Sequence, residues 1–324
     1  MRATTRQIHL DGDRTVPPLP VHTLVADEPG PTVIVTANIH GDETTGLAAA
    51  SALVEQLRDG ALTRGTTIVF PTLNPAGLAA STRAVPGDGG DLNRSFPGKR
   101  RGRTSERLAA RIWDELTTLK PDVVVDLHAD AAASIPYALL DRPVSLTGAA
   151  ARRMKEELER LGSASGLTVV REYPPDLYLR YALDRSLAGA LVNRARVPAI
   201  TVESGPRRIL DPAAVTATAG AVRNILVELG LCASGPGPHP TRVQGGPLRR
   251  HAAPRCQTAG WLEAVVAPGQ PFGRGDLLAR IRSPGGAVLE QIQASRTGIV
   301  LSWIEATWLT AGTVTGTLAV REGR

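Results

Sequence analysis

The sequence predicts an α/β domain with a mixed, largely parallel sheet, followed by a small all-β domain. Over roughly the first 230 residues, apolar β-branched runs alternate with segments of helical spacing, which is typical of strands joined by crossover helices. Beyond that point, short strands separated by glycine turns replace the helical pattern. A chain of 324 residues is long enough for one medium domain and one small domain.

The α/β part contains five predicted buried strands and five predicted helices. The strands are apolar and rich in Val, Ile and Thr, and we place them at Thr32–Ala37, Thr66–Thr72, Asp122–Leu127, Leu167–Arg171 and Ala199–Val202. The helices show amphipathic or alanine-rich spacing, and we place them at Glu43–Leu57, Glu106–Leu119, Thr147–Leu161, Leu187–Arg196 and Pro212–Leu229.

A Pro/Gly-rich stretch, CASGPGPHP at Cys232–Pro240, separates the two parts. We therefore predict a catalytic domain over 1–231, a linker over 232–241 and a β domain over 242–324. The expected strands of the β domain are Gly260–Val266, Leu277–Ile281, Ala287–Gln293, Gly298–Trp303 and Val314–Val320.

Composition excludes several classes of function. Nucleic-acid binding is not expected, because aromatic residues make up only 3% of the chain, although its net charge is +6. Membrane insertion is not expected either, since no apolar run reaches the roughly 18–20 residues that a spanning helix needs. The first twenty residues lack the apolar core of a secretory signal, which favours the cytoplasm and reduced cysteines.

The first candidate for chemistry is the segment Asn38–Glu43, in which His40 and Glu43 lie three residues apart after a predicted strand. An imidazole nitrogen and a carboxylate oxygen suit Zn²⁺ if both point to the same place. Alone, the same pattern also describes a surface histidine followed by a helix-start glutamate, which the helix dipole favours. The metal interpretation therefore depends on other motifs.

The second candidate is Asp126-Leu127-His128, at the end of another apolar strand. A buried Asp126 needs a partner, and orienting a metal-bound imidazole would supply one. A capping aspartate with a hydrogen-bonded core histidine is the alternative. Taken together, His40, Glu43 and His128 supply three ligands and leave one position open, which is the arrangement of a catalytic zinc site. The open position would hold a water of lowered pKa.

Two further segments supply groups for the reaction. Glu203 directly follows the apolar strand Ala199–Val202, where a carboxylate beside the metal-bound water would serve as general base. The long glycine-rich stretch 74–98 contains Arg83, Asn93 and Arg94, and reads as a functional loop. Arginines in such a loop either clamp a carboxylate, stabilise an oxyanion or are simply solvated.

The order of the motifs HGDE, NPAG, an arginine before DLNRSFPG, DLH and TVESG resembles the succinylglutamate desuccinylase/aspartoacylase family, within the wider superfamily of zinc carboxypeptidases. The resemblance covers residues 30–230. It implies a three-layer α/β/α sandwich and one Zn²⁺ per chain, held by His40, Glu43 and His128.

The resemblance also implies roles for the other motif residues. Glu203 would be the general base and then the proton donor to the leaving amine. Arg83 would polarise the scissile carbonyl, and Asn93 and Arg94 would bind the substrate carboxylate. In related enzymes a residue of the region that here contains Arg171, Tyr173, Tyr178, Arg180 and Tyr181 helps to bind substrate, and none of the five can be singled out.

The C-terminal segment resembles the barrel-sandwich domain of biotinyl and lipoyl carriers, through Gly260-Trp261-Leu262, Gly275-Asp276-Leu277 and Gly298-Ile299-Val300. No lysine occurs after Lys155, so the attachment site of a carrier is missing. Two roles remain open for this segment: it covers the pocket, or it forms the contact of a homo-oligomer.

We therefore expect a zinc-dependent hydrolase of a small carboxylate-bearing amide, such as an N-acyl amino acid, with N-acetyl-2,4-diaminobutyrate as one candidate. A metallocarboxypeptidase acting on a short peptide is the alternative, because the same residues would serve it. A catalytically inactive binding protein is the third interpretation, and the complete set of ligands together with Glu203 argues against it.

Overall fold

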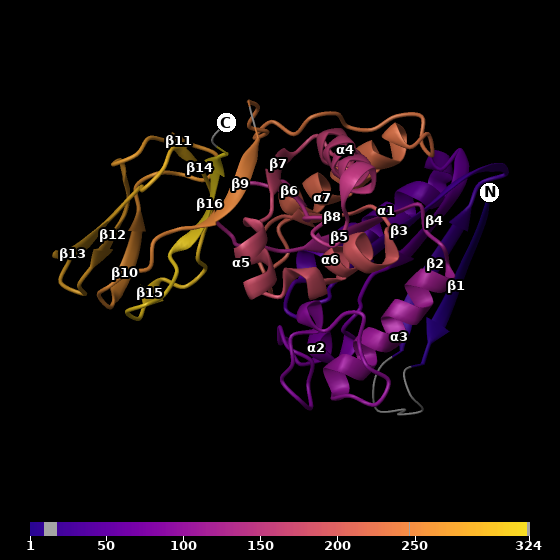
Figure 1. Cartoon of the computed structure of the whole chain (residues 1–324), viewed down its shortest axis with the longest axis horizontal. Helices are drawn as coiled ribbons and strands as arrows, with labels where there is room; N and C mark the ends of the chain where they lie inside the picture. The colour runs from indigo at the N-terminus through magenta and orange to yellow at the C-terminus, as the bar shows by residue number, and fades with distance from the viewer. Residues whose placement is uncertain (10–17, 246, 323–324) are drawn as a thin grey trace.

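The structure is a computed structural model that describes residues 1–9, 18–245 and 247–322. A large sheet runs through the whole molecule, with strand order β1-β2-β4-β3-β5-β8-β6-β7-β9-β16-β14-β11 (Figure 1). A second sheet, with order β13-β12-β10-β15, lies at the end of the molecule opposite the N-terminus. The predicted α/β class with its mixed, mostly parallel sheet and its small C-terminal β region is confirmed.

The strands of the α/β part are apolar where they cross the core. Their bounds are β1 Arg2–Ile8, β2 Leu19–Val25, β3 Glu28–Ala37, β4 Arg64–Phe70, β5 Val123–His128, β6 Tyr137–Leu140, β7 Thr168–Arg171 and β8 Ala199–Glu203. The central strands β4, β3, β5 and β8 are parallel neighbours, and β6 pairs antiparallel with β8. The short strand β6 is absent from our sequence prediction.

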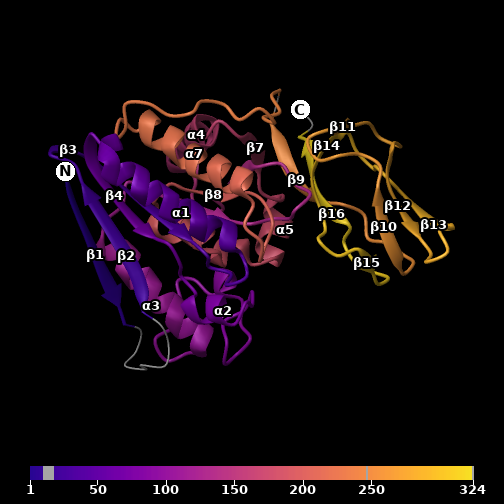
Figure 2. The ribbon, with the colours of Figure 1, turned by 180° about the vertical axis from the view of Figure 1, so that it is seen from behind.

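Helices cover both faces of this sheet. They are α1 Thr44–Gln56, α2 Pro75–Ala79, α3 Thr104–Thr118, α4 Gly148–Ala164, α5 Pro175–Arg180, α6 Leu187–Ala190 and α7 Pro212–Glu228, with short 3-10 or π turns at Leu57–Ala61, Leu92–Arg94, Leu183–Arg185 and Leu191–Ala195. Helices α1 and α7 pack together on the face that Figure 2 turns to the viewer, whereas α3 and α6 lie in front in Figure 1. The result is the three-layer sandwich that the resemblance implies.

The C-terminal strands are β9 Leu248–Ala252, β10 Gly260–Ala264, β11 Pro271–Phe272, β12 Leu277–Arg282, β13 Val288–Gln293, β14 Gly298–Trp303, β15 Trp308–Leu309 and β16 Gly316–Arg321. We call β9 to β16 the C-terminal β region. Its two sheets enclose an apolar core that includes Phe272, Leu278 and Trp303.

One connection was not predicted: β9 pairs with β7 in parallel, in the registers Val170↔Leu248 and Arg171↔Arg249. Four strands of the C-terminal β region thereby extend the sheet of the α/β part. Tyr137, Leu301 and Ala319 belong to a separate apolar cluster at this junction. The domain limits given above stay a prediction. Within the described residues, no helix is both long and apolar enough to cross a membrane.

Candidate active site

The principal site residues lie at the carboxyl ends of three parallel strands, at one edge of the sheet. His40 lies in the loop after β3, His128 is the last residue of β5, and Glu203 is the last residue of β8. His128 and Glu203 stand opposite each other in the register of β5 and β8. Since the carboxyl ends of parallel strands meet at the same edge, their side chains come together as predicted.

The loop between β3 and α1 is held by a residue to which sequence reasoning gave no role, Asn38. Its backbone is in the left-handed region, with φ of 52°. Its Nδ2 lies 2.9 Å, 3.2 Å and 3.0 Å from the carbonyl oxygens of His40, Gly41 and Glu43. The hydroxyl of Thr72, beyond β4, donates to Asn38 Oδ1 at 2.8 Å. The side chain of Asn38 therefore fixes the loop that presents His40 and Glu43.

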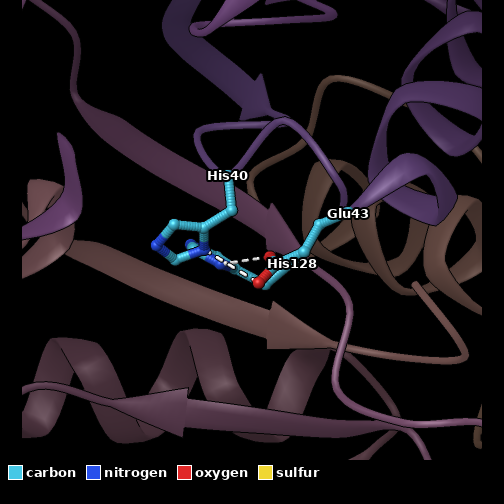
Figure 3. Close-up of side chains that lie close together, drawn as sticks. All are labelled: His40, Glu43 and His128. Atoms are coloured by element: carbon cyan, nitrogen blue, oxygen red, sulfur yellow. Dashed lines mark hydrogen bonds and ion pairs between the residues drawn. The ribbon is translucent and has the colours of Figure 1, made fainter. Parts of the chain in front are cut away.

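His40, Glu43 and His128 converge on one point, as Figure 3 shows. Nδ1 of His40 lies 2.8 Å from Oε1 of Glu43, and Nδ1 of His128 lies 2.9 Å from Oε2 of the same carboxylate. One donor atom from each residue lies within 4.8 Å of the others, and all three side chains are buried. Glu43 is the residue just before α1, not in its first turn as expected, and its carboxylate does not cap the helix.

Each imidazole is held from behind by an aspartate. Oδ2 of Asp126 lies 3.0 Å from Nε2 of His128, and Oδ1 of Asp91 lies 3.3 Å from Nε2 of His40. Strand β5 includes His128, one residue beyond the predicted strand, and two-residue spacing puts Asp126 and His128 on the same face of the strand. An aspartate on the outer nitrogen leaves the inner nitrogen of each ring for a metal, so this donor set fits a divalent ion such as zinc.

The charges in this cluster support one another. Burial alone would raise the pKa of Glu43, but His40 and His128 hold it well below its usual range. Burial alone would lower the pKa of His128, yet the carboxylates of Asp126 and Glu43 raise it well above its usual value. A buried carboxylate that remains ionised between two imidazoles has the protonation state that a metal ligand requires.

Glu203 stands beside this cluster with a different pKa shift. Burial raises the pKa of its carboxyl, and the neighbouring carboxylates of Glu43 and Asp130 raise it further, against the opposing charges of His128 and Arg250. A carboxyl group with a raised pKa is a stronger base when ionised, and more of it carries a proton near neutral pH, which suits the two roles predicted for Glu203.

Arg83, Asn93 and Arg94, from the loop over 74–98, also lie at this edge of the sheet. Arg83 Nη1 donates to Oε1 of Glu43 at 3.0 Å, so its guanidinium faces the cluster of His40, Glu43 and His128. Oδ1 of Asn93 accepts a hydrogen bond from the backbone N–H of Leu187 at 2.7 Å, which ties the loop to α6. Arg94 Nη1 donates to the carbonyl oxygen of Asn93 at 2.6 Å.

All seven predicted site residues line one cavity of about 270 Å³. Five further charged residues line it that the sequence did not lead us to expect: Asp130, Asp141, Glu172, Arg207 and Arg250. Glu172 directly follows β7, so the strand-end rule that selected Glu203 could have found it. Asp141 follows the unpredicted strand β6, and Arg250 carries no such signal.

The arginine and tyrosine cluster over 171–181 has other contacts. Its members are absent from the lining of this cavity. Tyr178 is buried and donates to Oδ1 of Asp141 at 2.6 Å, while Arg171 pairs with Glu159 and Glu322. A larger cavity, of about 900 Å³, shares only Asp141 with the cavity that contains His40, Glu43 and His128, so the larger space is not the candidate site.

The chain is similar to several known proteins along most of its length. The chain is 28% identical over 292 residues to N-alpha-acetyl-L-2,4-diaminobutyric acid deacetylase of Halomonas elongata, covering 86% of this chain and 79% of that protein. The product-bound structure of the ectoine utilization protein EutE (DoeB) of Ruegeria pomeroyi matches with a TM-score of 0.77 at 22% identity, over 98% of this chain and 95% of that one.

A metallo-carboxypeptidase of Burkholderia cenocepacia matches with a TM-score of 0.53 at 19% identity, over 70% of this chain and 65% of that one. At these identities the two structural matches show a shared fold. The family model for the succinylglutamate desuccinylase/aspartoacylase catalytic domain matches residues 29–229, which is more than half of the chain and contains the seven predicted site residues. The chain therefore belongs to the succinylglutamate desuccinylase/aspartoacylase family.

Proposed function

We propose that this protein is a zinc-dependent deacylase that hydrolyses a small N-acyl amino acid, with Nα-acetyl-2,4-diaminobutyrate as the first substrate to test. The observation that carries the proposal is the single cavity lined by the His40–Glu43–His128 cluster and by Glu203. The deacetylase of Halomonas elongata, which covers most of this chain, supports the choice of substrate.

His40, Glu43 and His128 would hold one Zn²⁺ per chain, and their buried nitrogen and oxygen donors fit this ion. Bound zinc supplies a water of lowered pKa and polarises a carbonyl oxygen. Asp126 keeps the imidazole of His128 in one orientation through the 3.0 Å contact with its outer nitrogen. The cytoplasmic location and any homo-oligomer stay predictions from the sequence.

Glu203 takes the proton of the attacking water and later gives it to the leaving nitrogen. Its raised pKa favours both transfers, since the carboxylate is basic enough to accept the proton and acidic enough to release it. Arg83, which already faces the cluster, stabilises the negative charge that develops on the carbonyl oxygen.

Asn93 and Arg94 would hold the carboxylate of the leaving amino acid. The oxygen of the Asn93 amide is used by the backbone of Leu187, and its nitrogen makes no hydrogen bond among the described residues. Arg94 is largely enclosed. Burial and the charges of Arg83 and Arg250 lower its pKa against the opposing charges of Asp91 and Glu172, so a further anion beside it is stabilising. These features favour a substrate with a carboxylate next to the scissile amide.

The size of the cavity favours a deacylase over a carboxypeptidase. About 270 Å³ lies just below the usual range of roughly 300–1,000 Å³ for small-molecule sites, so it fits an N-acyl amino acid better than a peptide. Because the fold is shared with the Burkholderia metallo-carboxypeptidase, short peptides are included among the substrates to be screened.

The experiment is a hydrolysis screen with the purified full-length protein, in which release of primary amine is measured from N-acetyl amino acids, N-succinyl amino acids and dipeptides. We expect release from an N-acetyl amino acid, its loss after removal of metal with a chelator, and its return on addition of one equivalent of Zn²⁺. Activity on dipeptides alone would replace the deacylase with a peptidase, and activity unaffected by the chelator would remove zinc from the proposal.

A further inference from the structure

One charged side chain in the cavity comes from outside the region that the family model covers. Arg250 lies on β9, the first strand of the C-terminal β region, and lines the same cavity as His40 and Glu203. Strand β9 is fixed on both sides, by β7 of the α/β part and by β16. The backbone of the shared sheet therefore carries Arg250 into the cavity.

The fold alone does not satisfy the guanidinium of Arg250. Nη1 donates to Oε1 of Glu172 at 3.0 Å, and the group lies 5.5 Å from the centre of the Tyr173 ring. Nε is buried without a hydrogen-bond partner in the part of the chain that the structure describes. A guanidinium offers five N–H groups, and buried donors are usually paired, so Arg250 retains capacity for an acceptor.

Arg94 faces the same cavity with similar spare capacity. Of its donors, only Nη1 makes a hydrogen bond among the described residues, to the carbonyl oxygen of Asn93 at 2.6 Å. Arg94 and Arg250 are close enough that the charge of Arg250 contributes to lowering the pKa of Arg94. Two neighbouring guanidiniums with free donors form the pattern that binds a carboxylate.

Several carboxylates also lie near these two arginines. Glu172 pairs with Arg250 and accepts from the backbone of Tyr173 at 3.0 Å. Burial raises the pKa of Asp141 to about 7, and the charge of Glu172 contributes to the rise, so Asp141 is only partly ionised at neutral pH. Asp91 also acts on Arg94, and Glu203 acts on Arg250, but neither carboxylate forms an ion pair with these arginines among the described residues. The buried Nε of Arg250 therefore still lacks an acceptor there, which an anionic ligand would supply.

We propose that Arg250 is a specificity-determining residue that binds the substrate carboxylate together with Arg94, so that the C-terminal β region completes the active site. The inference rests on the proposed function, because the carboxylate is that of the leaving amino acid. It assigns the C-terminal β region a direct part in substrate recognition.

The test compares ligands that differ only in the carboxylate. Calorimetry measures binding of 2,4-diaminobutyrate and of 1,3-diaminopropane to zinc-loaded full-length protein. The value of kcat/KM is measured for Nα-acetyl-2,4-diaminobutyrate and for mono-N-acetyl-1,3-diaminopropane. We expect Arg250→Met to lower the affinity for the carboxylate-bearing ligand, and kcat/KM for its acetyl form, about 10- to 100-fold, with the change in kcat/KM mainly in KM. For the ligand without the carboxylate, both quantities should change less than about 3-fold. Arg249→Met, which removes the neighbouring arginine of β9, should change neither ligand beyond about 2-fold.

A purely structural role predicts other results. If Arg250 only neutralises Glu172, Arg250→Met lowers the affinity for both ligands equally. The double variant Glu172→Gln/Arg250→Met then regains the wild-type affinity for both. Either result would overturn the inference. The double variant also avoids an unpaired buried carboxylate, so it stays informative if Arg250→Met alone does not fold. Failure of the wild-type protein to release amine from any substrate refutes the proposed function separately, while the binding comparison still decides the role of Arg250.

Discussion

Replacing Asp126 with Asn is expected to weaken zinc binding about 10- to 100-fold while the protein remains folded. Asp126 is almost fully buried, and its two oxygens have separate partners. Oδ2 lies 3.0 Å from Nε2 of His128, and Oδ1 accepts from the hydroxyl of Thr36 at 2.7 Å. An asparagine has one acceptor in place of two, so it can serve only one of these donors.

The magnitude follows from the hydrogen bond that is lost. If the amide oxygen stays with Thr36, the amide nitrogen faces the N–H of His128, and the charge-assisted contact becomes repulsive. Hydrogen bonds to charged groups contribute about 1.5–3 kcal/mol, and about 1.4 kcal/mol corresponds to one factor of ten in affinity. The imidazole also loses the negative charge that makes its inner nitrogen a better ligand.

The assay is competition for Zn²⁺ with a coloured chelator at fixed pH, with circular dichroism as the check on folding. Thr36→Val is the matched control, because it removes the hydrogen bond to the other oxygen of Asp126 and leaves the contact with His128. We expect the control to change zinc affinity by less than about 3-fold. Unchanged affinity in Asp126→Asn, or equal weakening in both variants, would refute the reasoning.

Three further predictions concern single groups of the site. His128→Ala should leave purified protein with far less than one zinc per chain by elemental analysis, and full retention would remove His128 from the ligand set. Glu203→Gln should keep zinc but lower kcat about 10²- to 10⁴-fold, so near-normal turnover would remove Glu203 from the role of general base. Asp141→Asn should stabilise the protein increasingly as pH rises above about 4. The folded state favours the neutral form of Asp141, with pKa about 7, so wild-type stability falls as pH rises from about 4 and levels off above about 7. The gain in free energy of unfolding should reach about 4 kcal/mol above pH 7 and vanish near pH 4, and urea titrations at both pH values would expose a gain that does not depend on pH.

Much of the site could be predicted because one rule covers it. His40, His128 and Glu203 each stand at the carboxyl end of an apolar parallel strand, and a run of β-branched residues is a strong local signal. The order of motifs then added Arg83, Asn93 and Arg94, which no local pattern distinguishes from solvated loop residues. Their roles stay predictions, whereas their shared cavity is observed.

The remainder depends on contacts between distant segments. Strand β6 has four residues, too few for a clear period, and its pairing with β8 is antiparallel in a mostly parallel sheet. Arg250 enters the cavity because β9 pairs with β7 almost eighty residues earlier in the chain, and no feature of the sequence around it indicates that pairing. The supporting role of Asn38 requires its backbone angle and three carbonyl positions, which spacing does not reveal.

The pairing of β7 with β9 also determines how the chain can be divided. A fragment that ends in the proline-rich stretch after α7 would leave β7 with a row of unpaired N–H and C=O groups, beside the apolar side chains of Tyr137 and Val170. Such an open edge is a template for association with other chains. We therefore expect that the α/β part, produced by truncation, would not behave as a minimal enzyme. Insertion or fusion should be better tolerated at the hairpin loop between β12 and β13, far from that edge.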